Sequence, residues 1–148
     1  MMQKKYLPLV KYLSIFLTCL LAACQYQPLA QDSSGAQRIN WSGECHQVQE
    51  DQYRDDVLLT IEDGLVKNVD WVAAPKQGTC RFSLADFKQI NQNRVVLESK
   101  SSPSCKLFVW QNSSYITLAQ HGCSNICSAE EHVLPILLNP EPAGCYQK

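Results

Sequence analysis

Six cysteines beyond residue 40 constrain the fold of this chain more than any other feature. Paired, they hold a small domain together by covalent links, whereas free thiols leave it dependent on its apolar core alone. Disulfides persist in proteins outside the cytoplasm and are rare within it. Whether these cysteines pair therefore depends on whether the chain is exported. They are Cys45, Cys80, Cys105, Cys123, Cys127 and Cys145.

The first residues have the three parts of an export signal in the expected order. Lys4, Lys5 and Lys11 supply positive charge, residues 13–21 (LSIFLTCLL) are mostly apolar, and two alanines follow. The apolar run is nine residues long, whereas a membrane-spanning helix needs about 20. We therefore predict that residues 1–23 are a signal peptide that is removed, rather than a spanning helix.

The end of this signal is similar to the bacterial lipobox, an aliphatic residue and two small residues before a cysteine. Leu21-Ala22-Ala23-Cys24 has that pattern. The resemblance implies cleavage before Cys24, a thioether-linked diacylglycerol on its sulfur and usually a third acyl chain on its new amino group. Two or more acyl chains hold a protein on a membrane stably, whereas one anchors it marginally. The alternatives are an ordinary signal peptide with a chance cysteine and an N-terminal anchor helix.

The residue after the lipidated cysteine carries a sorting signal in bacterial lipoproteins. Asp at this position keeps lipoproteins in the inner membrane, and this chain has Gln25. The resemblance therefore implies a lipid-anchored protein of the cell envelope, in the outer membrane rather than the inner one.

Removal of the signal leaves 125 of the 148 residues, which suits one small domain and a tether. Residues 24–40 are polar, contain Pro, Ser and Gly, and have no apolar periodicity, so we predict a lipid-anchored flexible tether. The domain then spans residues 41–148. Ten basic and 14 acidic residues remain after cleavage, a formal charge of −4. A nucleic-acid-binding domain needs a basic face, so no nucleic-acid partner is expected.

Acidic residues are concentrated between residues 50 and 56 (EDQYRDD). One interpretation is a solvated loop, and the other is a docking patch for a basic protein partner. The candidate partner-binding residues are Glu50, Asp51, Asp55 and Asp56.

An even number of cysteines in a small exported domain predicts three disulfides, each contributing about 2–4 kcal/mol. Sequence alone cannot choose among the possible connectivities. Our interpretation pairs Cys45 with Cys145 across the ends of the domain, Cys80 with Cys105, and Cys123 with Cys127. Because the last two are only four residues apart, one of them could instead bridge to Cys80 or Cys105.

The clearest secondary-structure signal is a β-hairpin at Asp63-Gly64. Two apolar runs, residues 57–62 and 65–72, flank this dipeptide, and a type I′ turn requires positive φ at both central residues. The expected register pairs Leu58 with Val69 and Ile61 with Val66.

The rest of the domain also has mainly strand character. Residues 79–84 and 94–99 are predicted strands, and residues 106–111 and 115–119 a second hairpin. A weak capping box at Ser83 predicts a single helical turn, and a stronger one at Ser128 predicts a short helix. We expect a mainly β fold, a small antiparallel β-barrel or sandwich with a short C-terminal helix, stapled by disulfides.

Three groups of reactive side chains could in principle carry chemistry, and none of them indicates catalysis. His121, Cys123, Cys127 and His132 have zinc-ligand chemistry, but exported thiols are usually oxidised. Cys45 and His46 are adjacent on a predicted strand and so point to opposite faces. Glu50, Asp55, Asp56 and Asp70 could form a carboxylate pair, but nothing sets a spacing across a site. We therefore expect a non-enzymatic protein with no metal and no cofactor.

The aromatic residues are expected to fill the core rather than to form a ligand platform. They are Trp41, Trp71, Phe82, Phe87, Phe108, Trp110 and Tyr115.

The domain resembles small disulfide-bonded, β-rich exported proteins such as the bacterial lysozyme inhibitors. The resemblance rests on the start Trp41–Cys45 (WSGEC), the Asp-Gly hairpin and the cysteine spacing. It implies a non-catalytic binding protein at the cell envelope, for example an inhibitor of a basic host lysozyme, which an acidic domain would attract. The alternatives are a structural or assembly lipoprotein that docks onto an envelope complex, and a small-ligand carrier with a cavity inside a barrel.

Overall fold

A computed structural model describes residues 38–146 of the chain. The predicted signal peptide, Cys24 and nearly all of the predicted tether lie outside the described residues. Within residues 38–146, no helix is long and apolar enough to cross a membrane.

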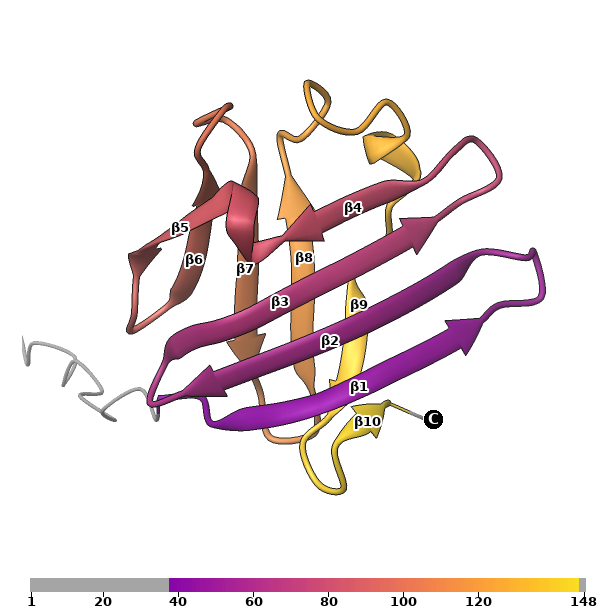
Figure 1. The fold of residues 1–148 in the computed structure, drawn as a ribbon. Coiled ribbons are helices and arrows are strands. Elements are labelled where there is room, and N and C mark those ends of the chain that lie inside the picture. Colours follow the sequence, from indigo (N-terminus) through magenta and orange to yellow (C-terminus); the bar gives the residue numbers. More distant parts are fainter. Residues whose placement is uncertain (1–37, 147–148) are drawn as a thin grey trace, which may run out of the picture. The chain divides into compact units, whose positions relative to one another are not determined.

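Strands supply nearly all of the regular secondary structure of the described chain (Figure 1). Two one-turn 3-10 helices accompany them, η2 (Leu84–Asp86) and η3 (Glu130–His132). The strands are β1 (Trp41–Val48), β2 (Arg54–Glu62), β3 (Leu65–Ala74), β4 (Cys80–Ser83), β5 (Phe87–Asn91), β6 (Val95–Ser99), β7 (Lys106–Gln111), β8 (Ile116–His121), β9 (Ile136–Asn139) and β10 (Gly144–Cys145).

The strands form two antiparallel sheets that follow the order of the chain. One sheet has the order β1-β2-β3-β4 and the other β10-β9-β8-β7-β6-β5, so within each sheet the strands pair with their neighbours in sequence. Figure 1 shows the first sheet lying across the second, with η2 between β4 and β5. The mainly β, antiparallel, disulfide-bonded fold is therefore confirmed.

The barrel alternative is wrong, because the edge strands of one sheet do not pair with the edge strands of the other, and the two sheets therefore do not close into a barrel. At one edge, η2 turns the chain between Ser83 and Phe87, and β4 and β5 do not pair. At the other edge, a disulfide rather than a hydrogen-bonded ladder joins β1 to β10.

The Asp-Gly hairpin is confirmed, but half of its predicted register is wrong. Asp63 (φ 49°) and Gly64 (φ 76°) both have positive φ, and Ile61 pairs with Val66 as expected. A bulge between Thr60 and Ile61 then shifts the ladder, so that Val69 lies opposite Leu59 instead of Leu58. A β-bulge places an extra residue on one strand and so changes the pairing of every residue beyond it.

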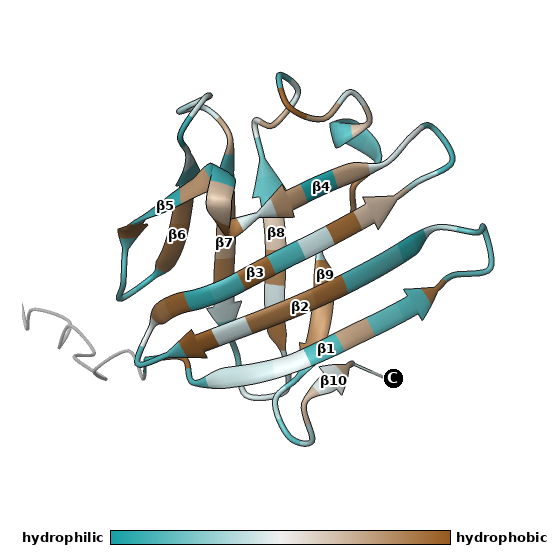
Figure 2. Cartoon of the chain, in the orientation of Figure 1, coloured by the Kyte–Doolittle hydropathy of each residue, from teal (hydrophilic) through white to brown (hydrophobic). Residues whose placement is uncertain are grey.

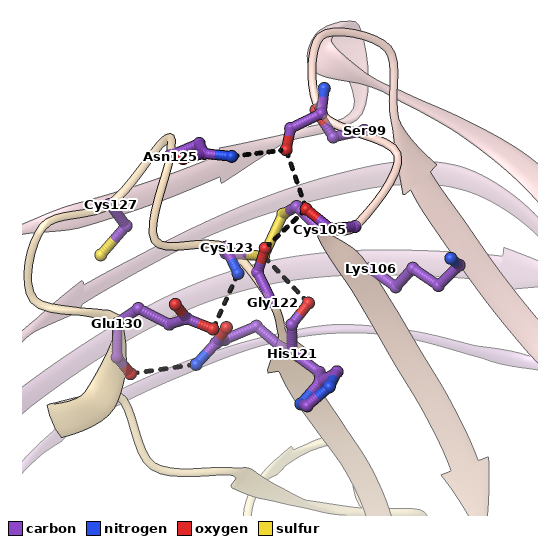
Figure 3. Close-up of a disulfide and its surroundings, with 12 residues drawn as sticks. Ser99, Cys105, Lys106, His121, Gly122, Cys123, Asn125, Cys127 and Glu130 are labelled. Atoms are coloured by element: carbon purple, nitrogen blue, oxygen red, sulfur yellow. Dashed lines mark hydrogen bonds between the residues drawn. A yellow bond between two sulfur atoms is a disulfide. The ribbon is translucent and has the colours of Figure 1, made fainter.

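The predicted C-terminal helix is also wrong, because only the three residues of η3 form a helical turn there. Ala129 occupies the N-cap position, and no side chain caps the turn. The carboxylate of Glu130 instead accepts a hydrogen bond from the N–H of Cys123, at 2.7 Å (Figure 3). The Glu130 carboxylate thus holds the loop that precedes η3.

All six cysteines of the domain are paired, as predicted, and Cys45–Cys145 is the expected pair. The other two pairs are Cys80–Cys127 and Cys105–Cys123, so the interpretation of Cys80–Cys105 and Cys123–Cys127 is wrong, and the alternative bridge to Cys80 or Cys105 is confirmed. The long connection between β8 and β9 is therefore held at Cys127 to β4 and at Cys123 to the residue before β7. Figure 3 shows this connection folded around the Cys105–Cys123 bond.

One apolar core lies between the sheets. Figure 2 shows brown runs of hydrophobic residues along β2 and β3. Buried residues alternate with more exposed ones along β2 and along the second half of β3, as expected where one face of a strand is buried. The largest fully buried side chains come from both sheets: Trp71, Phe82, Leu59, Ile61, Leu97, Leu107, Ile116, Leu118, Ile136 and Leu138.

The two outer faces of this fold differ in chemistry. On the first sheet, charged side chains pair across strands, as in Asp56 with His46 and Asp70 with Arg81. On the second sheet, Glu98 likewise pairs with Lys88 and Lys106, and a row of partly exposed apolar side chains also crosses the strands. Strand register places Val96, Phe108 and Ala119 side by side, and Trp110 and Leu137 on either side of Thr117.

Candidate binding cleft

A large hollow lies at the ends of β6 and β7 and has a volume of about 890 Å³. Small-molecule sites in proteins range from about 300 to 1,000 Å³, so this cleft is large enough for a ligand. It is lined by Ile39, Asn91, Asn93, Arg94, Val95, Val96, Phe108, Val109, Trp110, Gln111, Asn112 and Ser113.

Strand alternation gives the cleft its apolar wall. Val95 and Val109 are buried and lie opposite each other in the ladder, facing the core. Phe108 and Trp110 occupy the intervening positions of β7 and therefore face outward. Trp110 is 48% exposed, the highest value among the three tryptophans. The core prediction is wrong for Phe108, Trp110 and Tyr115, and it is confirmed for Trp41, Trp71, Phe82 and Phe87.

Two turns supply the polar wall. Asn91 ends β5, and its side-chain oxygen accepts a hydrogen bond from the N–H of Arg94, at 3.0 Å. Asn112 follows β7, and its side-chain oxygen accepts from the N–H groups of Ser114 and Tyr115, at 2.8 and 2.9 Å. Asn side chains commonly stabilise turns in this way. These bonds occupy the side-chain oxygens of both amides.

A second set of hydrogen bonds fixes the turn that carries Arg94. The side-chain amide of Gln89 donates to the carbonyl of Gly64 and accepts from the N–H of Val66, at 2.6 and 2.9 Å. Gln92 donates to the carbonyl of Asp63, at 2.9 Å. The β5–β6 turn is thus tied to the β2–β3 turn, and one rim of the cleft is held in place.

The acidic segment does not form a single patch. Asp55 is only 1% exposed and lies on the core side of β2, so a partner cannot contact it in this structure. Asp56 faces outward and pairs with His46 at 2.9 Å and with Arg54 at 3.2 Å. Glu50 and Asp51 are exposed in the turn before β2. A docking role for Glu50, Asp51 and Asp56 stays a prediction.

Asp55 is buried among neutral hydrogen-bond donors. Its Oδ1 accepts from Nε1 of Trp71 at 2.9 Å and from the hydroxyl of Tyr53 at 3.3 Å. Its Oδ2 accepts from the side-chain amide of Gln47 at 3.0 Å. Burial raises the pKa of Asp55, and these three donors oppose that rise. The Tyr53 hydroxyl also accepts from the N–H of Leu134, at 3.1 Å, so the cluster ties β2 to the β8–β9 connection.

The cysteines of the candidate metal and nucleophile sites are used for disulfide bonds. Cys123, Cys127 and Cys45 are disulfide-bonded, and among residues 38–146 no cluster of three or more His, Cys, Asp or Glu could hold a metal ion. His46 turns toward Asp56 and Glu44, which raise its pKa by hydrogen bonding.

The carboxylates considered as candidates for acid–base chemistry do not lie together in one site. Asp70 accepts two hydrogen bonds from the guanidinium of Arg81, at 3.0 and 2.7 Å, on the outer face of the first sheet. Asp55 lies on the core side of the same sheet.

Sequence reasoning missed the residues of the cleft. A signal was present, because alternation along residues 106–111 places Leu107 and Val109 on one face and Phe108 and Trp110 on the other. No sequence pattern indicates that residues 91–94 line the cleft, because their position depends on how the β5–β6 turn is held against the β2–β3 turn.

Comparisons with protein families, curated proteins and solved structures found no match to this chain. The lipobox and the likeness to lysozyme inhibitors therefore stay predictions from the sequence.

Proposed function

We propose that this chain is a lipid-anchored, non-catalytic binding protein of the bacterial cell envelope, in the outer membrane, and that the cleft around Trp110 is its binding surface. The observation that carries the proposal is the exposure of Trp110 beside Phe108 in a cleft of about 890 Å³. Aromatic residues are enriched where proteins bind partners, because they bury a large area at small entropic cost.

The lining of the cleft favours binding over chemistry. Its twelve residues comprise amides, apolar and aromatic side chains, one serine and one arginine. General acid–base and nucleophilic catalysis rely on a titratable side chain close to the reacting group. Within this lining, no histidine, cysteine or carboxylate supplies one.

The cleft also lies where the predicted tether enters the domain. Ile39 lines the cleft and is buried, and its carbonyl accepts a hydrogen bond from the N–H of Gly64 at 2.9 Å. The 14 residues between Cys24 and Ile39 can span at most about 50 Å. A lipid on Cys24 would thus keep the cleft within reach of envelope components near the membrane.

The anchor is tested by labelling cells with radioactive palmitate. We expect label in the protein, and its loss in Cys24→Ser. Cys19→Ser is the matched control, because Cys19 belongs to the segment predicted to be removed. Equal labelling of the two variants would contradict the lipid anchor.

Binding through the cleft is tested by photo-cross-linking in cells. A photoreactive amino acid replaces Gln111, which lines the cleft, or Leu58, which is 39% exposed on the outer face of the other sheet. We expect a discrete cross-linked product from position 111 and none from position 58. No product at either position, or the same product at both, would overturn the proposal.

The lysozyme version of the proposal has its own assay. The purified domain should slow hydrolysis of cell walls by lysozyme, and Trp110→Ala should relieve that inhibition. No inhibition at micromolar excess removes lysozyme as the partner and leaves binding through the cleft to the cross-linking experiment.

A further inference from the structure

The cleft combines an exposed aromatic surface with an unusual number of amide side chains. Trp110 and Phe108 form the aromatic part. Four amide side chains share the lining: Asn91, Asn93, Gln111 and Asn112. A purely apolar ligand would strip water from these amides without replacing its hydrogen bonds, which costs free energy.

Amides are well suited to a ligand rich in hydroxyl groups. Each amide offers two donors and one carbonyl acceptor, and a hydroxyl group both donates and accepts. The oxygens of Asn91 and Asn112 are occupied by backbone N–H groups, so these two residues offer mainly donors. An indole ring complements the apolar C–H face of a sugar ring while the amides meet its hydroxyl edge. These features together favour a saccharide.

Arg94 adds one positive charge to the lining. It is exposed, and among the described residues no carboxylate lies within ion-pair distance of its guanidinium. Arg81, by contrast, is ion-paired with Asp70 on the other sheet. A guanidinium binds a carboxylate through paired hydrogen bonds, so Arg94 favours a saccharide that carries a carboxylate.

We propose that the cleft around Trp110 binds a carboxylate-bearing saccharide chain, of the kind in which N-acetylglucosamine alternates with N-acetylmuramic acid. One sugar ring stacks on Trp110, the amides bind hydroxyl and acetamido groups, and Arg94 pairs with the lactyl carboxylate. This inference rests on the proposed function, since it names the ligand class of the same cleft. A protein partner in the cleft is the competing outcome.

The test uses residues 25–148, secreted behind an ordinary signal peptide so that the disulfides form. The probe is a peptide-free tetrasaccharide of alternating N-acetylglucosamine and N-acetylmuramic acid. The tetramer of N-acetylglucosamine is the matched neutral probe, because it differs mainly in lacking the lactyl carboxylates. Binding is measured by isothermal titration calorimetry.

We expect the acidic tetrasaccharide to bind more tightly than the neutral one. Trp110→Ala should weaken both by about ten-fold or more. Arg94→Gln should weaken only the acidic probe, by about ten-fold. Leu58→Ala, on the other sheet, should leave both unchanged, and circular dichroism confirms that each variant is folded.

Three results would overturn the inference. They are no heat with either probe at about 1 mM, affinities that Trp110→Ala leaves unchanged, and an Arg94→Gln effect of the same size on both probes. If the probes fail but Gln111 cross-links a protein in cells, the binding function stands and the saccharide is excluded. If neither probe binds and Gln111 cross-links neither protein nor saccharide in cells, the proposed function itself fails.

Discussion

The indole N–H of Trp71 donates a hydrogen bond to Oδ1 of Asp55 at 2.9 Å, with both side chains buried in the core. A carboxylate without a cationic partner is costly to bury. Its stabilisation depends on neutral donors from Trp71, Tyr53 and Gln47. Asp55, which both interpretations of the acidic segment place on the surface, thus helps to hold the core together.

This arrangement predicts a distinctive pH dependence of stability. Burial raises the pKa of Asp55 in the native state, so the native carboxyl keeps its proton to higher pH than the unfolded one. The free energy of unfolding should therefore fall as pH rises from about 4 through that raised pKa. Asp55→Asn keeps an acceptor for Trp71 and Tyr53 and carries no charge, so it should lack this fall.

Urea unfolding between about pH 4 and about pH 8 measures the difference. The free energy of unfolding of the wild type relative to Asp55→Asn should decline with rising pH. Asp86→Asn is the control, because Asp86 is exposed in η2. Parallel curves for the wild type and Asp55→Asn would show that Asp55 titrates alike in the folded and unfolded chain.

Trp71 and Trp110 should respond differently to truncation. Trp71 is fully buried and packs on Phe82 with ring centroids 4.9 Å apart, so Trp71→Ala should cost about 3–5 kcal/mol. Trp110 is 48% exposed, so Trp110→Ala should cost much less, about 1 kcal/mol or below. Denaturant unfolding of both variants checks this difference, and equal losses would place Trp110 in the core.

How far the sequence predicts this domain depends on how local each signal is. The Asp63-Gly64 turn follows from the φ requirement of two adjacent residues, and the structure has it. The bulge beyond Thr60 has no such local signature, and it moved Leu58 out of its predicted pairing with Val69. The capping box from Ser128 does not form in the structure: Ala129 takes the N-cap position with no side-chain cap, and the Glu131 carboxylate lies beside His132.

The pairing of the cysteines could likewise not be predicted from local sequence signals. The number of disulfides follows from an even count of cysteines, but connectivity depends on the spatial path of the β8–β9 connection. That path brings Cys127 to Cys80 and Cys123 to Cys105. The cleft was missed for the same reason, since residues 91–94 and 108–113 meet only once both hairpins are in place.

The disulfides should differ in their contribution to stability. Cys45–Cys145 closes a segment of 100 residues, and Cys105–Cys123 closes one of 18. In the chain-entropy description, the longer loop stabilises by about 1–2 kcal/mol more. Replacing Cys45 and Cys145 with Ala should therefore lower the urea midpoint further than replacing Cys105 and Cys123. The reverse order would show that native-state contacts around Cys123 outweigh loop entropy.

Gly64 should not tolerate a side chain. It has φ of 76°, and a Cβ there would lie 2.6 Å from the carbonyl oxygen of Gln92. Gly64→Ala should destabilise the domain by about 1–3 kcal/mol, since it combines backbone strain with a clash. Gly144→Ala is the matched control, because a Cβ at Gly144 meets nothing within 4 Å. Thermal unfolding of the two variants should separate them, and a Gly64→Ala variant as stable as Gly144→Ala would contradict the tight approach of the two turns.

The yield of cross-linked product from position 111 in living cells, with and without Trp110, tests the binding cleft most directly. Trp110→Ala should lower that yield several-fold at unchanged protein level, because the aromatic surface that holds the partner is lost. Leu58→Ala, on the outer face of the other sheet, should leave the yield as it is. An unchanged yield in Trp110→Ala would contradict a binding site centred on this cleft.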